Sequence, residues 1–202
     1  MTDTIFKIDL SQVLKKSPVR IEIGCGQTRR EGTIGIDRVD LPSVDIVTDI
    51  ENGLSFLPDN SVDEIYSSSC FEHINNFVSL MKEIIRVLKP GGKATIFVPH
   101  FSNPYFYSDP THVRTFGLYT FYYFVDSKYQ LKRKVPAFYF DFKIKIISQK
   151  FIFGAPFPLR GLFLKCVGVL FNLNMFMQEL YEGCFSHIFP CHGMEVIFTP
   201  DK

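Results

Sequence analysis

The sequence predicts an α/β fold in which a mostly parallel sheet is built from short, buried strands. Compact apolar runs recur along the first half of the chain, at 19–23, 33–37, 44–47, 62–67 and 93–98. Glycine or aspartate stands at the end of each of the first three runs. Short strands that alternate with helical or loop connections are typical of a parallel sheet, which binds its ligands at the carboxyl ends of its strands.

The connecting elements follow from local residue patterns. A short leading helix is expected at 9–16, before the first strand. Segment 77–88 places apolar side chains at the 3.6-residue period of an amphipathic helix, namely Phe77, Leu80, Met81, Ile84, Ile85 and Leu88. Pro90-Gly91-Gly92 then breaks the helix and returns the chain to the fifth strand.

The second half of the chain is less regular. Aromatic, proline, aspartate and histidine residues crowd 100–117, which suits a functional loop. Beyond it we expect a helix at 118–124, a strand at 140–148, an apolar helix at 159–182, and a last strand at 194–199 on the C-terminal edge of the sheet.

Composition narrows the class of protein. The 22 Lys and Arg residues nearly balance the 21 Asp and Glu residues, so no nucleic-acid partner is expected. Five cysteines at irregular spacing argue for reduced thiols rather than a disulfide framework. The N-terminus lacks a signal-peptide pattern and the chain lacks an 18-residue apolar run, so a cytoplasmic protein is expected.

Three polar positions point to one crevice. Glu22-Ile-Gly24-Cys-Gly26 follows the first strand, Asp37 ends the second and Asp49 follows the third. The glycines permit close approach of a ligand, and a carboxylate at Asp37 can accept bonds from ribose hydroxyls. Only 27–33 separates Gly26 from the next strand, too short for the helical crossover that would hold a pyrophosphate. A ligand with an amino-acid end and an adenosine end therefore fits better than a dinucleotide.

Three motifs in this order carry a family resemblance. Val19-Arg-Ile-Glu-Ile-Gly-Cys-Gly-Gln, Pro58-Asp-Asn-Ser-Val-Asp-Glu-Ile-Tyr-Ser-Ser-Ser-Cys-Phe-Glu-His-Ile and Arg86-Val-Leu-Lys-Pro-Gly-Gly-Lys resemble those of class I S-adenosylmethionine-dependent methyltransferases over residues 19–98. The short first crossover resembles a compact bacterial branch of that family. The resemblance implies a Rossmann-like, mostly parallel sheet with an antiparallel last strand, helices on both faces and C-terminal lid or acceptor elements.

By the same resemblance, S-adenosyl-L-methionine is the cofactor. Its methionine end would lie at Glu22, Gly24 and Gly26, its ribose at Asp37, and its adenine at Asp49 and Ile50. Ser69 and Cys70 would lie beside the sulfonium. We expect a single domain over 1–202, with the cofactor-binding core at 19–98, an acceptor loop and apolar lid at 99–190, and the last strand at 191–202.

The acceptor side is expected on the loop after the fifth strand. His100, Asp109 and His112 are the candidate catalytic residues, because a histidine near neutrality can take the acceptor's proton and an aspartate can fix its tautomer. A loop held by turn chemistry, with histidines bonded to backbone, is the alternative. His73 is a further candidate. Cys184, His187, Cys191 and His192 match no standard zinc spacing, so no metal is expected.

The sequence thus predicts methyl transfer to an unidentified small-molecule, sugar or lipid-linked acceptor. Segment 159–181 is read as a lid or dimer helix, with contact to a membrane surface as the alternative because Arg160 and Lys165 flank apolar bulk. A methyltransferase-like binding protein without turnover is the rival reading. A nucleotide-dependent oxidoreductase is disfavoured by the short crossover.

Overall fold

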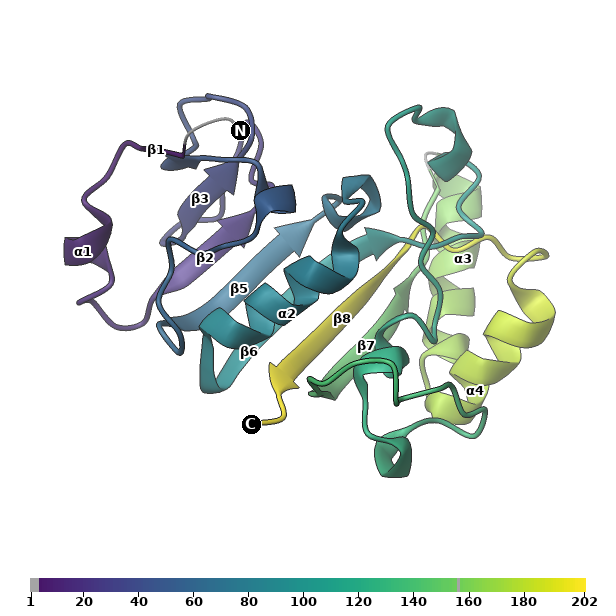
Figure 1. Cartoon of the computed structure of the whole chain (residues 1–202). Coiled ribbons are helices and arrows are strands. Elements are labelled where there is room, and N and C mark those ends of the chain that lie inside the picture. Colours follow the sequence, from purple (N-terminus) through teal and green to yellow (C-terminus); the bar gives the residue numbers. More distant parts are fainter. Residues whose placement is uncertain (1–3, 156) are drawn as a thin grey trace.

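An eight-stranded sheet organises the chain in a computed structural model that describes residues 4–155 and 157–202. Its order is β1-β4-β3-β2-β5-β6-β8-β7. The strands are β1 Ile5–Phe6, β2 Arg20–Ile23, β3 Ile34–Asp37, β4 Ile46–Val47, β5 Val62–Ser68, β6 Leu88–Pro99, β7 Ile144–Ile152 and β8 Gly193–Pro200. Strands β2 to β6 run parallel, while β8 is antiparallel to both its neighbours and β1 to β4. The predicted fold class is confirmed (Figure 1).

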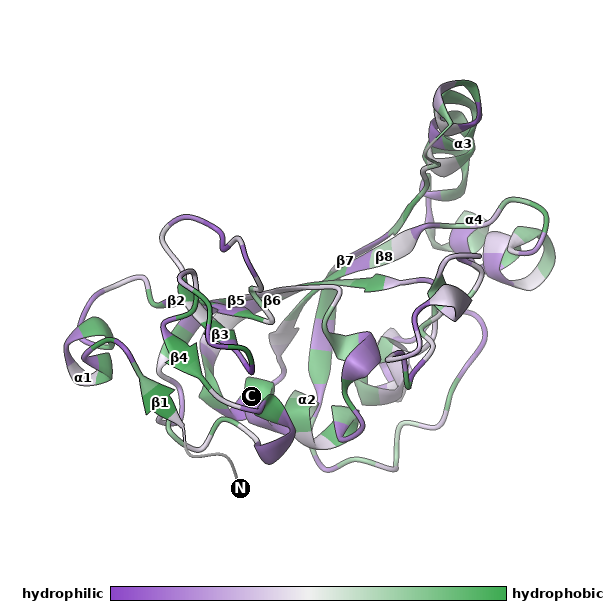
Figure 2. Cartoon of the chain, turned by 90° about the horizontal axis from the view of Figure 1, so that it is seen from above, coloured by the Kyte–Doolittle hydropathy of each residue, from purple (hydrophilic) through white to green (hydrophobic). Residues whose placement is uncertain are grey.

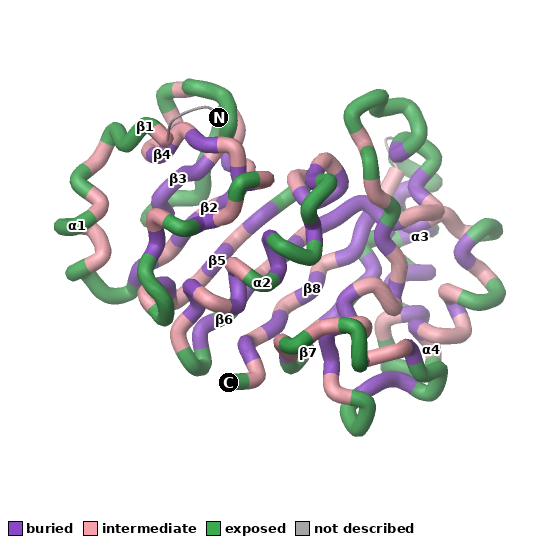
Figure 3. The backbone as a smooth tube through the Cα atoms, viewed as in Figure 1, coloured by how far each residue is buried: buried purple, intermediate pink, exposed green. Residues whose placement is uncertain are grey.

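One face of the sheet is fully buried. Along β2, β5 and β6 buried residues alternate with half-buried or exposed ones over most of each strand, as the colours of Figure 3 show. Helix α2 (Phe77–Val87) lies against this buried face and contributes Leu80, Met81 and Ile84 to the core. A phenylalanine cluster extends the core toward β8, where Phe121 packs on Phe198 and on Phe77.

The opposite face has a reduced helical layer. Over β2 and β5 it carries the half-buried Glu22 and Tyr66, and Arg30 of the loop after β2 stacks on the Tyr66 ring. Helix α3 (Pro158–Phe171) rises on this side only beyond the edge strand β7 (Figure 2). The connections after β2 and β3 are too short for crossover helices, so loops stand where a second layer was expected.

Several elements differ from the sequence-based prediction. The leading helix α1 is shorter, Leu10–Val13, and 118–124 forms only a 3₁₀ turn, Phe121–Phe124. The strand expected at 140–148 is β7, which begins at Ile144. The last strand, β8, is not at the edge: it lies between β6 and β7.

The apolar helix expected at 159–182 is broken into α3, α4 (Met175–Leu180) and a π-helical turn, Tyr181–Phe185. Two asparagines explain the break. The Asn172 side chain pairs with the backbone N–H and C=O of Phe151 in β7, both at 2.8 Å. Asn174 caps α4 by accepting from the Met177 N–H at 3.0 Å. Within the described residues, no helix is long and apolar enough to cross a membrane.

Candidate functional site

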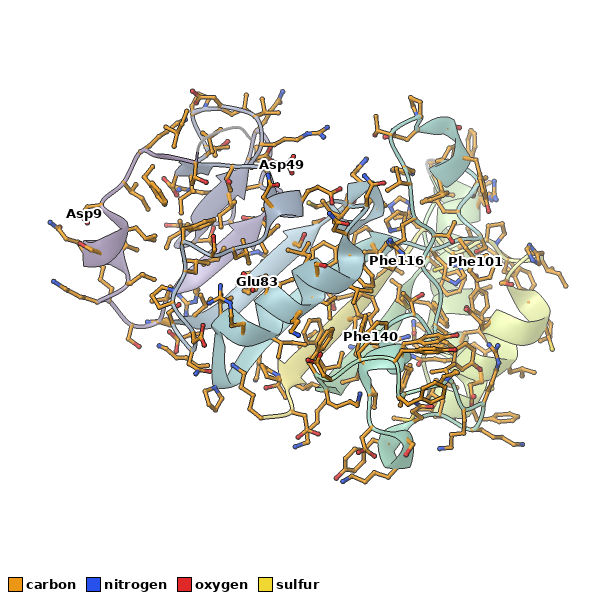
Figure 4. The ribbon with its side chains drawn as sticks, in the orientation of Figure 1. Asp9, Asp49, Glu83, Phe101, Phe116 and Phe140 are labelled. Atoms are coloured by element: carbon orange, nitrogen blue, oxygen red, sulfur yellow. The ribbon has the colours of Figure 1, made fainter. Side chains whose placement is uncertain are left out.

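A cavity of about 620 Å³ opens at the carboxyl ends of β2, β3, β4 and β5. Six of the seven residues predicted to bind cofactor line it: Gly24, Gly26, Asp37, Asp49, Ile50 and Ser69. Figure 4 labels Asp49 beyond the ends of these strands. The lining also includes Cys70, His73 and Thr111, so the loop after β5 and the loop after β6 border the same space.

The floor of the cavity is shaped by the turn after β2. Gly24 has φ +71°, and a Cβ built on it would lie 2.6 Å from both Cβ and Sγ of Cys70. Gly26 has φ +56°, and a Cβ there would meet no atom within 4 Å. Glycine at the first position is therefore required by packing, whereas at the second it leaves room for a ligand against the backbone.

Asp37 ties this turn to β3. Its Oδ2 accepts from the Gly26 N–H at 2.9 Å, and its Oδ1 accepts from the Val39 N–H at 3.0 Å. A carboxylate has about four acceptor positions, so further donors from a ligand can be accommodated. Asp49 caps the 3₁₀ turn Ile50–Asn52 by accepting from the Glu51 N–H at 3.0 Å.

Glu22 is the one predicted cofactor residue that does not line the cavity. Its Oε2 accepts from the Arg30 N–H and from the Thr33 hydroxyl, which holds the loop 27–33 in place. The structure therefore gives Glu22 a supporting position behind the glycine turn.

The two loops meet at the other end of the cavity. His73 Nδ1 lies 2.9 Å from the Thr111 hydroxyl, and the rings of His73 and His112 are 4.8 Å apart. Asp109 Oδ2 lies 3.6 Å from His112 Nε2. Two of the three predicted catalytic residues, Asp109 and His112, thus come together beside the cavity.

Sequence reasoning missed Glu72. This carboxyl is 1% exposed, and its Oε2 has no hydrogen-bond partner among the described residues. Burial raises the pKa of Glu72 to about 7. Glu72, His73 and His112 each offer one ligand atom, and the three atoms lie within 4.8 Å of one another. The adjacent Glu-His pair before the helix was the available signal, but its partner is about 40 residues away and only the fold brings it close.

His100 lies elsewhere. It is fully buried, its Nε2 lies 2.9 Å from Glu182 Oε2, and its Nδ1 lies 2.8 Å from the Ser102 hydroxyl. It does not line the cavity. Figure 4 shows its neighbour Phe101 well away from Asp49, on the side of α3 and α4.

The segment 159–181 does not cover the cavity either. None of its residues lines that space, and α3 stands at the far end of the sheet from β2 and β3 (Figure 1). In this structure the segment therefore lies away from the cavity, and its role as a lid over the acceptor pocket stays a prediction. Segment 118–185 is instead held together by its own aromatic packing, as at Phe151 and Tyr181, whose ring centroids are 4.6 Å apart.

Comparison with known proteins gives two results. Residues 30–96 match the family model described as a methyltransferase domain. Among solved structures, the YcgJ protein of Bacillus subtilis is similar at 15% identity, with 96% of this chain and 97% of that chain covered and a TM-score of 0.55. A SAM-dependent methyltransferase from Archaeoglobus fulgidus is similar at 17% identity, with 93% and 88% covered and a TM-score of 0.50. No curated protein matches the sequence.

Proposed function

We propose that this chain is a class I S-adenosylmethionine-dependent methyltransferase, and that the cavity after β2 to β5 is where it binds the cofactor and methylates its acceptor. S-adenosylmethionine supplies a methyl group on a sulfonium, a good leaving group. The single observation that carries the assignment is that Gly24, Gly26, Asp37, Asp49, Ile50 and Ser69 line one cavity.

The contacts of the cavity support separate roles for its two ends. The open space at Gly26 suits the methionine end, Asp37 the ribose hydroxyls, and Asp49 with Ile50 the adenine. Ser69 and Cys70 line the same cavity, and in this assignment they lie beside the sulfonium. Glu22 acts by holding loop 27–33.

The acceptor would enter beside His73 and Thr111. We assign it the neighbourhood of Glu72, Asp109 and His112, and we assign His100 to folding rather than to chemistry. Methyl transfer needs the acceptor atom in line with the sulfonium methyl, so orientation by these side chains supplies much of the acceleration. A methyltransferase-like binding protein that has lost turnover remains the rival.

Calorimetric titration with S-adenosylhomocysteine, the product, tests the cofactor assignment. Asp37→Asn should weaken binding at least about tenfold, because a charged acceptor is replaced and such bonds are worth about 1.5–3 kcal/mol. Asp126→Asn is the matched control: Asp126 accepts from the N–H two residues on, as Asp37 does, but lies outside the cavity. Equal affinity for wild type and Asp37→Asn would remove Asp37 from the site.

The exposed surface of helix α3 gives an argument for one class of acceptor. Its outer side carries exposed apolar residues, with Leu159 86% and Val169 69% exposed. The helix also carries Arg160 and Lys165 and no Asp or Glu. Apolar side chains beside cations suit the surface of an anionic lipid bilayer. A homodimer through this face would bring like charges together, which is unfavourable. Peripheral contact with an anionic membrane and a lipid-linked acceptor are therefore the specific form of the proposal.

The acceptor class can be assigned by partition. The protein is incubated with methyl-labelled S-adenosylmethionine and a total cell extract, which is then split into aqueous and organic phases. Labelled product in the organic phase supports a lipid-linked acceptor. Labelled product in the aqueous phase, separated by chromatography from the unreacted S-adenosylmethionine, supports a free sugar or small molecule. An extract that gives no labelled product in either phase beyond a control without the protein, while S-adenosylhomocysteine still binds, favours the rival without turnover.

A further inference from the structure

We propose that Glu72, His73 and His112 bind a divalent transition-metal ion at the acceptor end of the cavity. The inference rests on the proposed function for its role in the reaction, but the site itself follows from geometry. One ligand atom from each side chain lies within 4.8 Å of the other two. Metal–ligand bonds are about 2.0–2.2 Å for imidazole nitrogen and carboxylate oxygen, so a small closing movement brings all three to one ion.

The first support is the Glu72 carboxyl. It is 1% exposed, and its Oε2 has no hydrogen-bond partner among the described residues. Buried polar atoms are almost always paired, and an unpaired carboxylate oxygen is costly. Its own backbone is engaged, because the Glu72 carbonyl accepts from the Val113 N–H at 2.9 Å. A bound cation is the partner that this oxygen lacks.

The second support is the orientation of the histidines. His112 Nδ1 lies 2.8 Å from the Phe106 carbonyl oxygen, which only accepts, so Nδ1 carries the proton and Nε2 keeps its lone pair. His73 Nδ1 lies 3.3 Å from the Thr111 carbonyl oxygen and 2.9 Å from its hydroxyl. A ring N–H held by a carbonyl is the usual arrangement behind a metal-binding imidazole, because it fixes the tautomer that binds.

The donor set selects the kind of ion. Two imidazoles and one carboxylate suit Zn²⁺, Co²⁺ or Fe²⁺, whereas Mg²⁺ and Ca²⁺ prefer oxygen ligands. Three protein ligands leave positions open for water or acceptor. Asp109 Oδ2, 3.6 Å from His112 Nε2, borders the site.

The position of the site indicates what the ion would do in the reaction. His73 and Thr111 line the cofactor cavity, so an acceptor hydroxyl bound to the ion would lie next to the transferable methyl group. A bound cation would lower the pKa of such a hydroxyl, and its proton would pass to solvent water. The oxygen's lone pair would then form the new C–O bond as the C–S bond breaks, and the sulfur would leave as a neutral thioether with the electron pair of the broken C–S bond.

Metal titration of the full chain tests the site without any acceptor. After treatment with a chelator, wild-type protein should bind one Co²⁺ and show visible absorption bands of nitrogen and oxygen ligation, without the intense sulfur band that cysteine would give. Glu72→Gln and His112→Gln should each weaken binding at least about 100-fold. His187→Gln is the matched control, because His187 is exposed and outside the group.

Two further measurements make the result decisive. Circular dichroism and thermal unfolding of the metal-free variants establish that they fold. Titration of the metal-free wild type with S-adenosylhomocysteine tests the cofactor site on its own. Absence of Co²⁺ binding, or equal binding by wild type and Glu72→Gln, overturns the metal site; if S-adenosylhomocysteine still binds in that case, the proposed function stands. Loss of binding confined to the two ligand variants supports the metal site.

Discussion

At the scale of single residues, the two glycines after β2, Gly24 and Gly26, have different structural roles. Gly24 lies against Cys70, so Gly24→Ala combines a left-handed backbone with a Cβ that has no room. We expect it to lower the free energy of unfolding by about 2–5 kcal/mol, from backbone strain of about 1–2 kcal/mol and overpacking of about 1–3 kcal/mol. Thermal or denaturant unfolding measures this loss.

Gly26→Ala is the paired variant. Its backbone is also left-handed, but its Cβ enters open space, so the loss of stability should be confined to about 1–2 kcal/mol of strain. Because Gly26 lines the cavity, the binding free energy for S-adenosylhomocysteine should weaken by more than the free energy of unfolding falls. If the two variants unfold alike and bind alike, contact with Cys70 and approach of the ligand do not distinguish these positions.

At the scale of elements, Glu182 joins three segments. Its Oε2 meets His100 in the loop after β6, and its Oε1 accepts from the Leu118 N–H at 2.8 Å. Glu182 itself lies on the π-helical turn that follows α4. Glu182→Ala leaves both buried groups unpaired, so we expect a loss of about 2–4 kcal/mol and a fall in Tm of roughly 5–15 °C. Glu31→Ala, at an exposed loop position, serves as control.

Cofactor affinity tests whether the contact between Glu182 and His100 is structural or belongs to the reacting site. Neither Glu182 nor His100 lines the cavity, so the Glu182→Ala and His100→Gln variants should bind S-adenosylhomocysteine like wild type below their melting temperatures. A fall in affinity without a fall in Tm would return His100 to the reacting site.

Helix α3 carries the prediction about surfaces. Replacing Leu162 and Phe163, which are 65% and 54% exposed, by serine should abolish sedimentation with vesicles rich in phosphatidylserine. Removing two large apolar side chains costs a few kcal/mol of insertion, hence a 100-fold or larger loss of binding. Phe138→Ser is the control, because Phe138 is 80% exposed but lies outside α3. The membrane contact is contradicted if the wild-type protein does not sediment with such vesicles. It is also contradicted if the wild-type protein elutes as a dimer in size-exclusion chromatography and the two serine substitutions convert it to a monomer.

At the scale of the whole molecule, local patterns predicted most of the sheet and selected residues that line one cavity. Each of these features depends only on residues close together in sequence. They are the apolar strand runs, the amphipathic spacing of α2, and the glycine and aspartate at strand ends. The single helix predicted at 159–182 is wrong. The chain breaks at 172–174 because the Asn172 side chain bonds to the backbone of Phe151 in β7, 21 residues away. The place of β8 between β6 and β7 likewise depends on pairing between distant segments.

The proposed acceptor end shows the same limit. Asp109 and His112 were candidates because they share a loop, and His73 was a further candidate. Glu72 was not, because only the fold, through the hydrogen bond from the Val113 N–H to the Glu72 carbonyl, brings that loop back to it. His100 was chosen for its position directly after β6, but its side chain turns toward Glu182. Direction of a side chain at a strand end is decided by packing, which a single sequence does not display.

The place of β8 between two earlier strands has a consequence for how the sheet assembles. Residues 193–200 follow β6 and β7 in the chain, yet they pair with β6 on one side and β7 on the other. Until β8 is inserted, β6 and β7 each present an open row of amide and carbonyl groups, the condition under which strands pair with the wrong chain. Correct closure of this end of the sheet therefore depends on β8 reaching the gap before another strand does.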